Sequence, residues 1–557
     1  MTTVKQASPW GSAVRGLAAA LVAACLLLPF INKPFHIDDT VFLRVAQRIL
    51  EYPLAPYEFS YSWNATHQSI WKQSLHPPLH SYLLAIVGMT TGFGEIPVHL
   101  WGLCFAFGAV FLMYRLAARF CQFPMTATLA SLAAPAFLVS ATTAMADVPM
   151  FFFWLLAVYV TVHAGDEARP TRLWVAGLAA SAAVMTKYFG IALVPLLVVY
   201  WKVSHRRARF NRSGRFNLHA MALWLPVVTL SLWGVYSFVQ FGEFHPLAAA
   251  DMAATYKSPL MILGNLWSPV PYLGAAILWP CWLLVKTGSL PRLWRALLAN
   301  TAVAAGLLYW ISFSSNAGPL IRMVESSLYA AMAATGVLVL VLCIESCSGR
   351  RDADTLLLGL WTFGTLFFAA FVNWTFNARV ILPLIFPATL LIVRWIEVQP
   401  ESQSWAKWSR LAVAPTAVVA LLVGAADYQY ASAMKEFVDA RVQGHIDAGR
   451  NVYFTGHWGF QWYLEEAGAV ALDARRAPAA EGDILVQKSG NDNFFPEAPY
   501  EVIREDLWFT PICLHTNKNS IHGDFYAGWG GSLPFAFNHD CMLERFRVFR
   551  VLSPDAK

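Results

Sequence analysis

The chain has 557 residues, of which 57% are hydrophobic and 13% are charged, and its formal net charge is +6. Soluble proteins carry about 25% charged residues, so this composition excludes an ordinary soluble protein and predicts a membrane protein with several spans. The positive charge is not a nucleic-acid signature, because its placement along the chain matters more than its sum.

Apolar segments long enough to cross a bilayer recur along the first 430 residues. The first follows Lys5 and Arg15 and is also compatible with a signal peptide cleaved near Cys25, but its apolar residues continue to Ile31 and favour an uncleaved helix. Residues 1–430 are therefore predicted to form an all-α polytopic membrane domain. We expect about thirteen transmembrane helices, at residues 14–32, 97–114, 126–143, 147–164, 172–186, 189–203, 218–241, 270–286, 297–313, 326–345, 354–372, 380–396 and 411–428.

The distribution of Lys and Arg predicts the orientation of these helices. If the N-terminus is cytoplasmic and the spans alternate, the inner loops receive most basic residues and the outer side receives isolated cations. The inner set is Arg115, Arg119, Arg169, Arg172, Lys202, Arg206, Arg207, Arg209, Arg212, Arg215, Lys286, Arg292, Arg295, Arg350, Arg351, Arg394, Lys407 and Arg410. We therefore expect a multi-pass protein of the bacterial inner (plasma) membrane with its C-terminus outside. Residues 78–93 break the alternation if counted as a span, so we expect an interfacial or re-entrant helix there.

The first outer loop, residues 33–96, contains "HIDDTVFLRVAQRIL" at 36–50. Its apolar residues fall on one helical face, which predicts an amphipathic helix on the membrane surface. Asp38 and Asp39 stand at its N-terminal end, where a carboxylate is favoured by the helix dipole and caps free N–H groups. Capping accounts for one acid but not for two in a row.

Three more charged residues are predicted on the same side of the membrane. Asp147 lies in "TTAMADVPMFFFW", Lys187 in "TKYFG" and Arg379 in "NWTFNARVILPLIFP". Each has an ordinary alternative, which is helix capping for Asp147 and extension of the charge to the interface for the two cations. Outer cations against the general charge bias nevertheless indicate an anionic ligand.

This set of residues fits transfer from a lipid phosphate. A carboxylate acts as general base on an acceptor hydroxyl, and cations neutralise the leaving phosphate. The loop histidines, which include His36, His76 and His80, lack a regular ligand spacing, so a divalent metal is possible but not favoured, and we expect no metal or other cofactor.

The order of several short motifs resembles the GT-C glycosyltransferases. The acid pair is followed by "HPPLHSYLLA", "ADVPMFFFWLLA", "MTKYFGIALVPLL" and "ARVILPLIFP", and the nearest branch holds the dolichyl-phosphate-mannose protein mannosyltransferases and the bacterial lipid A aminoarabinose transferases. The resemblance implies that Asp38 is the catalytic first-loop acid, that Asp39 takes the position of a neighbouring Glu and that Asp147 is the second-loop acid. It also implies that Lys187 and Arg379 bind the donor phosphate, together with His76, which stands where the family usually has Lys.

The resemblance implies an integral membrane glycosyltransferase that moves a hexosyl or pentosyl group from a polyprenyl-phosphate donor to a lipid, glycan or protein acceptor at the outer face. The alternative is a multispan transporter or lipid flippase. Transporters place ionisable residues near the middle of their spans, whereas the span interiors predicted here are almost free of charge. A family member that only binds lipid is a third possibility.

The composition becomes more polar after about residue 430. Residues 431–449 predict an amphipathic helix that ends at Gly449, and "NVYFTG", "DILVQKS" and "FRVFRVL" predict buried strands. We therefore expect a small extracytoplasmic α/β domain at 431–557. A disulfide between Cys513 and Cys541 and two free thiols are both compatible with the sequence.

Overall fold

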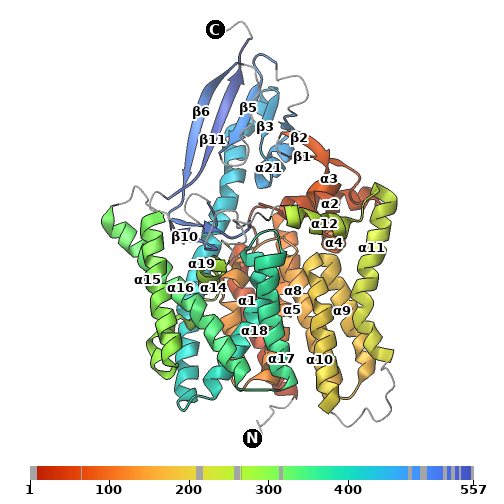
Figure 1. The fold of residues 1–557 in the computed structure, drawn as a ribbon. Coiled ribbons are helices and arrows are strands. Elements are labelled where there is room, and N and C mark those ends of the chain that lie inside the picture. The colour runs from red at the N-terminus through yellow and green to blue at the C-terminus, as the bar shows by residue number, and fades with distance from the viewer. Residues whose placement is uncertain are drawn as a thin grey trace.

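A computed structural model describes residues 9–63, 65–207, 218–255, 257, 264, 266–312, 318–473, 480–489, 499–518, 523–527, 533–537 and 541–553. Long helices form the lower part of the molecule, and a small sheet lies above them (Figure 1). The N-terminus lies at the free lower end of the helices, and the chain ends at the top of the sheet.

The helical part consists of apolar helices, most of which are long. In chain order they are α1 (Pro9–Leu27), α5 (Glu95–Phe120), α6 (Pro124–Leu132), α7 (Pro135–Ser140), α8 (Asp147–Asp166), α9 (Leu173–Thr186), α10 (Leu193–Arg207), α11 (Leu225–Phe241), α14 (Pro269–Ala276), α15 (Arg292–Ser312), α16 (Pro319–Ser348), α17 (Ala353–Phe367), α18 (Ala378–Glu397) and α19 (Ser402–Phe437).

Within the described residues, eight helices are long and apolar enough to cross a membrane, or nine if the bent pair formed by Pro269–Ala276 and Trp279–Ser289 is one span. The protein is therefore a multi-pass membrane protein. The remaining predicted spans correspond to shorter, broken or less apolar helices, so the count of thirteen is not confirmed. Part of the predicted inner basic loop, residues 208–217, lies outside the described residues.

The centre and the rim of the helical part differ as expected for a bundle in lipid. Helix α18 lies at the centre, with 94% of its apolar window buried. Helices α14 and α16 cross closely, because a Cβ at Gly274 would lie 1.9 Å from the Met332 carbonyl oxygen. At the rim, α1, α11 and α15 expose apolar side chains such as Leu21, Leu232 and Leu307.

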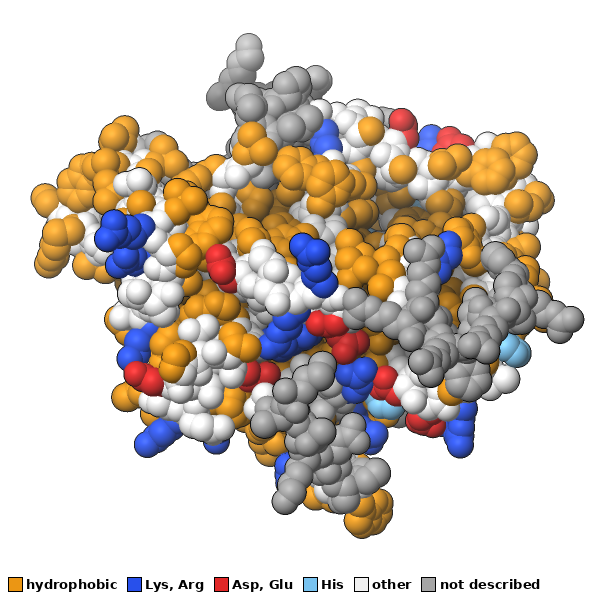
Figure 2. Space-filling view, turned by 60° about the horizontal axis from the view of Figure 1, so that its bottom comes forward, with side chains coloured by type: hydrophobic (Ala, Val, Ile, Leu, Met, Phe, Trp, Pro, Cys, Tyr) orange, Lys and Arg blue, Asp and Glu red, His pale blue; other side chains and the backbone are white. Residues whose placement is uncertain are grey.

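The lower end of the bundle is rich in charge. Figure 2 shows Lys and Arg side chains lying among Asp and Glu there, with hydrophobic side chains around them. Arg119 forms ion pairs with Asp166 at 2.6 Å and with Asp354 at 2.9 Å. Basic residues therefore gather at the end that the sequence analysis expects to face the cytoplasm.

Short elements of the first loop cover the upper end of the bundle beside the sheet. They are α2 (Asp39–Glu51), the hairpin of β1 (Ser60–Trp63) and β2 (Thr66–Ser69), α3 (Ile70–Gln73) and α4 (Leu79–Thr91), and α12 (His245–Thr255) lies near them (Figure 1). Helix α2 is amphipathic as predicted and buries Val41, Val45 and Ile49 against the protein. Helix α4 has 13 residues and is too short to cross the bilayer.

A five-stranded mixed sheet forms the upper region, in the order β4-β3-β5-β11-β6. Strands β3 (Val452–Thr455), β4 (Val470–Ala471) and β5 (Ile484–Lys488) are parallel, whereas β11 (Met542–Val551) is antiparallel to both β5 and β6 (Tyr500–Phe509). The three predicted strands are confirmed as β3, β5 and β11. Helix α21 (Gly459–Ala467) connects β3 to β4, and the short strands β7 to β10 lie between Leu514 and Phe537.

Helix α19 links the two parts of the molecule. It runs through the predicted boundary at residue 430 and continues through Val438–Val442 into α20 (Gln443–Asp447), so the predicted last span and the predicted amphipathic helix form one continuous rod. Gly449 follows with a φ of 72°, a left-handed conformation that favours glycine. The ring of Phe437 stacks on that of Phe546 in β11 at 4.2 Å, which seats the sheet on the helix.

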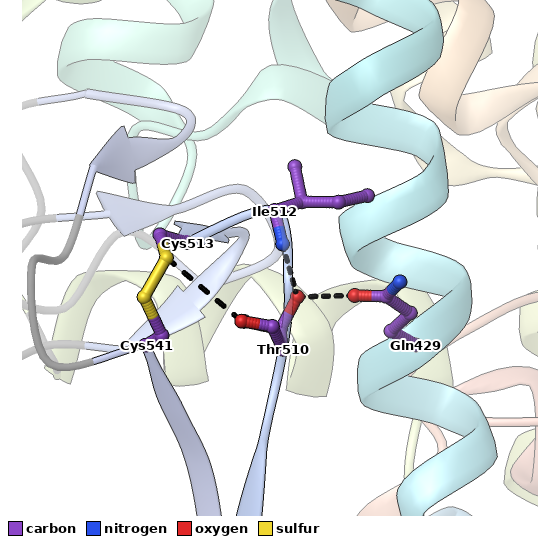
Figure 3. Close-up of a disulfide and its surroundings, with 5 residues drawn as sticks. All are labelled: Gln429, Thr510, Ile512, Cys513 and Cys541. Carbon is purple, nitrogen blue, oxygen red and sulfur yellow. Dashed lines mark hydrogen bonds between the residues drawn. A yellow bond between two sulfur atoms is a disulfide. The ribbon is translucent and has the colours of Figure 1, made fainter.

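The disulfide that the sequence left open is present, between Cys513 and Cys541 (Figure 3). It joins the residues that follow β6 to the start of β11, where the Thr510 N–H also donates to the Cys541 carbonyl at 2.8 Å. The Thr510 hydroxyl contacts Gln429 of α19. The disulfide therefore closes the segment 513–541 beside the helix.

Candidate active site

Four of the residues predicted from the sequence form one hydrogen-bonded chain of alternating charge. Arg379 donates through one terminal nitrogen to Asp38 Oδ2 at 2.7 Å and through Nε to Asp147 Oδ2 at 3.0 Å. Lys187 Nζ donates to the other oxygen of Asp147 at 2.5 Å. These residues come from four separate segments of the chain, and the fold brings all four together.

Asp38 occupies the N-cap position of α2, but its side chain makes no capping hydrogen bond. The interpretation of Asp38 as a side-chain cap is therefore wrong, because its carboxylate turns to Arg379 instead. Burial raises the pKa of Asp38, but the charge of Arg379 and its hydrogen bond outweigh burial and hold that pKa below its ordinary value. The carboxylate is therefore ionised at neutral pH.

Asp147 is the first residue of α8, whose N-cap is Ala146, and it makes no capping hydrogen bond either. Its capping interpretation is also wrong, since both carboxylate oxygens accept from cations. The Asp147 side chain is 1% exposed and that of Asp38 is 28% exposed. Of the two acids, Asp38 is the one a substrate can reach, and Asp147 is placed to hold the cations.

His76 lies in the electrostatic neighbourhood of these four residues. Burial together with the nearby charges of Lys187 and Arg379 lowers the pKa of His76 to about 3, although Asp38 opposes this shift. Its ring packs 5.1 Å from that of Phe42, and its carbonyl accepts from Tyr57 at 2.7 Å. A neutral His76 offers an N–H donor to a ligand rather than a positive charge.

The structure does not bring Asp39 to this site. Successive helical residues point in different directions, and Asp39 instead lies 3.3 Å from the ring of His36 in a second cluster with Lys33, Asp427, Thr516 and Tyr526. We call these six residues the Asp427 cluster. Every side chain in it is at most 3% exposed.

Sequence reasoning missed Asp427, Lys33 and Tyr526 as neighbours of the site. Asp427 carried a usable signal, because it is a charge near the end of an otherwise apolar predicted span, in "GAADYQYAS". Lys33 directly follows the first apolar segment and pairs with Asp427 at 2.5 Å. Tyr526 had no local signal, since only the fold brings residues 523–527 onto α19.

Among the described residues, no group of three or more His, Cys, Asp and Glu side chains could hold a metal ion. The first-loop histidines make other contacts. His80 lies 2.7 Å from the Ala144 carbonyl through Nε2, and His36 lies within the Asp427 cluster. The candidate site is thus a set of carboxylates and cations at the ends of helices.

Several solved structures have a similar chain course at low sequence identity. ArnT from Cupriavidus metallidurans bound to undecaprenyl phosphate is 15% identical, with 86% of this chain and 94% of that chain covered and a TM-score of 0.41. The Archaeoglobus fulgidus oligosaccharyltransferase tethered with an acceptor peptide is 14% identical, with 82% and 63% covered and a TM-score of 0.46. No curated protein sequence matches the chain.

A family model matches part of the sequence itself. The dolichyl-phosphate-mannose-protein mannosyltransferase model covers residues 75–233, which include His76, Asp147 and Lys187. Asp38 and Arg379 lie outside the matched segment and join it in space through the hydrogen bonds of Arg379. Over residues 75–233 the chain carries the sequence pattern of the dolichyl-phosphate-mannose-protein mannosyltransferases, which confirms its resemblance to the GT-C glycosyltransferases.

Proposed function

We propose that the protein is a glycosyltransferase that moves a sugar from a polyprenyl-phosphate donor to a hydroxyl group of a lipid, glycan or protein acceptor. The observation that carries the proposal is the chain Asp38–Arg379–Asp147–Lys187, which unites a partly exposed carboxylate with the buried Arg379 and the partly buried Lys187 at the upper end of the bundle. We further propose that this end faces the outside of a bacterial inner membrane, because Lys and Arg side chains gather at the opposite end (Figure 2).

In the proposed reaction the acceptor oxygen attacks the anomeric carbon of the donor sugar. The bond between that carbon and the phosphate oxygen breaks, and polyprenyl phosphate leaves with the bonding electrons. The acceptor proton passes to Asp38, which is ionised in the resting protein. Attack opposite the leaving group inverts the configuration at the anomeric carbon.

In this reaction the cations Arg379 and Lys187 bind carboxylates at rest and phosphate when the donor is present, and this accounts for the arrangement of the network. In the resting protein Arg379 neutralises Asp38 and Asp147 together. When the donor phosphate enters, it competes for the guanidinium, and the pKa of Asp38 rises as its contact with Arg379 weakens. Asp147 keeps Lys187 and Arg379 in place, so that positive charge meets the leaving phosphate without rearrangement.

The position of the charges argues against transport as the function. Asp147 is the first residue of α8, Arg379 is the second residue of α18, and Asp38 directly precedes α2. Ionisable groups of transporters lie instead near the bilayer midplane. A site at helix ends fits a reaction at the membrane surface.

The test uses purified full-length protein in liposomes, supplied separately with undecaprenyl-phosphate-linked mannose, glucose and aminoarabinose. Release of undecaprenyl phosphate, with or without an acceptor extract, reports turnover. We expect turnover of at least one donor and its loss by at least about 1,000-fold in Asp38→Asn. Glu51→Gln, an exposed acid of the same loop, is the matched control. Near-normal turnover in Asp38→Asn would refute the assignment.

A further inference from the structure

The Asp427 cluster adjoins the candidate site but takes no part in the proposed transfer step. Asp427 is its centre. The Oδ2 atom accepts from Lys33 Nζ at 2.5 Å and from the Tyr526 hydroxyl at 2.6 Å, and Oδ1 accepts from the Thr516 hydroxyl at 2.6 Å. A carboxylate that is 0% exposed is thus satisfied entirely by side chains from other parts of the fold.

His36 connects Asp427 to the turn that carries Asp38. Its Nε2 lies 3.2 Å from Asp427 Oδ2, and its Nδ1 lies 3.3 Å from Asp39 Oδ2. Because each ring nitrogen faces a carboxylate, the imidazolium, which donates from both nitrogens, fits this position better than a neutral ring. With His36 protonated, the cluster balances two cations against two carboxylates, which a fully buried site requires.

The cluster joins three distant parts of the chain around this turn. Lys33 and His36 follow the first span, Asp427 lies in α19, and Thr516 and Tyr526 lie in the segment closed by the disulfide. The same turn touches the sheet region directly. The Phe35 N–H donates to the Tyr463 hydroxyl at 2.8 Å, and a Cβ at Gly459 would lie 2.3 Å from the Phe35 carbonyl oxygen.

We propose that Asp427, acting through His36 and Asp39, is a positioning residue for Asp38. Asp38 lies in sequence between the anchored residues His36 and Asp39, and its side chain points away from the cluster and toward Arg379. The inference rests on the proposed function of Asp38. It assigns helix α19 and the segment closed by the disulfide a direct share in the geometry of the catalytic carboxylate, and a misplacement of about 1 Å costs on the order of 100-fold in rate.

The test compares wild type with Asp427→Asn, which keeps the size of the side chain and removes its charge. Turnover of the donor accepted in the liposome assay gives kcat and KM, and hydrogen–deuterium exchange reports the backbone of residues 33–43. We expect kcat to fall by about tenfold to 100-fold, KM for the donor to stay within about threefold, and exchange at residues 33–43 to become faster.

Glu544→Gln is the matched control, because it breaks another buried ion pair whose two residues belong neither to the candidate site nor to the Asp427 cluster. Glu544 pairs with Lys488 at 2.5 Å between β11 and β5, and both side chains are at most 7% exposed. We expect this variant to lower the midpoint of thermal unfolding and to leave kcat and exchange at residues 33–43 unchanged. Equal losses of kcat in Asp427→Asn and Glu544→Gln would overturn the positioning role.

A double-mutant cycle tests whether Asp427 acts through His36. If it does, His36→Gln combined with Asp427→Asn loses no more kcat than the more severe single variant, whereas additive losses would overturn the route through His36. The two proposals fail differently. A wild type without turnover of any donor refutes the proposed function, and unchanged exchange at residues 33–43 in Asp427→Asn refutes this inference.

Discussion

Asp38 and Asp39 are adjacent in sequence, yet they belong to two charged networks with different properties. The network of Asp38 includes Arg379, Asp147 and Lys187 and is partly open, since the Asp38 side chain is 28% exposed. The Asp427 cluster, which holds Asp39, is closed on all sides, and the Asp39 side chain is 0% exposed. Both networks pair carboxylates with cations, so residue types alone do not distinguish them.

The difference in exposure fits two different tasks, which are proton exchange with a substrate and the fixing of a turn. A group that exchanges a proton with a substrate has to be reachable, and its charge partner has to be able to turn to the ligand. A group that fixes a turn is most effective when it is buried and fully hydrogen-bonded, since a broken buried pair costs about 3–5 kcal/mol. The comparison therefore predicts that substitutions in the open network of Asp38 strongly lower the reaction rate. Substitutions in the closed Asp427 cluster should lower both the rate and the stability.

After Asp38 itself, the largest effect is expected at Arg379, which bridges both acids of the open network. Arg379→Met should lower kcat/KM by about 100- to 1,000-fold, because the leaving phosphate loses its preorganised charge. Arg379→Lys should fall between this variant and wild type, since a lysine cannot reproduce two directed hydrogen bonds from one planar group. Arg322→Met serves as a control, because Arg322 lies near the start of α16 and donates to the Trp310 carbonyl at 2.9 Å. A loss of the same size there would contradict the role of Arg379.

Asp147→Asn should have the largest effect on stability among the site variants. It leaves Lys187 and Arg379 close together without the carboxylate between them, at a cost of about 3–5 kcal/mol in the free energy of unfolding. The measurement is denaturant unfolding in detergent. Asp166→Asn, which loosens a more exposed pair with Arg119 at the lower end, should cost no more than about 1 kcal/mol. Equal losses would show that burial does not set the difference.

Removal of the disulfide between Cys513 and Cys541 tests the contribution of the C-terminal segment to the Asp427 cluster. The bond spans a sequence separation of 28, so the double variant Cys513→Ser/Cys541→Ser should lose about 3–4 kcal/mol of stability. Thr516 and Tyr526 lie within the segment that it closes, so faster exchange at residues 33–43 should accompany the loss. Cys25→Ser, which alters an exposed free cysteine, should change neither quantity.

The smallest expected effect is a pH dependence that arises from His36. Burial and Lys33 lower the pKa of His36, but Asp427 and Asp39 outweigh them and raise it above 6.5. Besides these groups, Tyr526 and Tyr430 face the ring. Because the folded pKa is raised, the stabilisation is complete below pH 6.5 and is lost as the pH rises through the folded value, by about 1.4 kcal/mol for each unit of the shift.

Thermal unfolding followed between pH 6 and pH 9 measures this term. Wild type should lose stability over the alkaline part of the range more steeply than His36→Gln, which cannot carry the charge. Parallel curves for the two proteins would mean that His36 is neutral in the folded state. The pH at which the difference between the two curves levels off gives the folded pKa of His36.

Much of the architecture could be predicted because it follows from local patterns. Apolar segments of span length identified most membrane helices, such as 218–241, which is helical over its whole length. Alternating apolar residues identified β3, β5 and β11. The count of spans was less certain, because helices such as α6 and α7 are broken between Leu132 and Pro135 and no longer show the length that marks a span.

The sequence also singled out the four charged residues that form the open network. Asp38, Asp147, Lys187 and Arg379 stood out because charge at the end of an apolar segment is costly and needs a reason. Helix direction then placed them at one end of the bundle. Their types and their place at a common end of the bundle could thus be predicted from the sequence.

Only the tertiary structure decided what each carboxylate does. Both capping interpretations failed, because a carboxylate gains more from a directed, charge-assisted bond to Arg379 or Lys187 than from a free N–H at a helix end. The separation of Asp39 from Asp38 depends on side-chain directions at the start of α2 and on Asp427, which lies 388 positions further along the chain. Local periodicity carries no information about such a distant partner. The Asp427 cluster could therefore not be predicted from the sequence, because it forms only when packing brings three separate segments together.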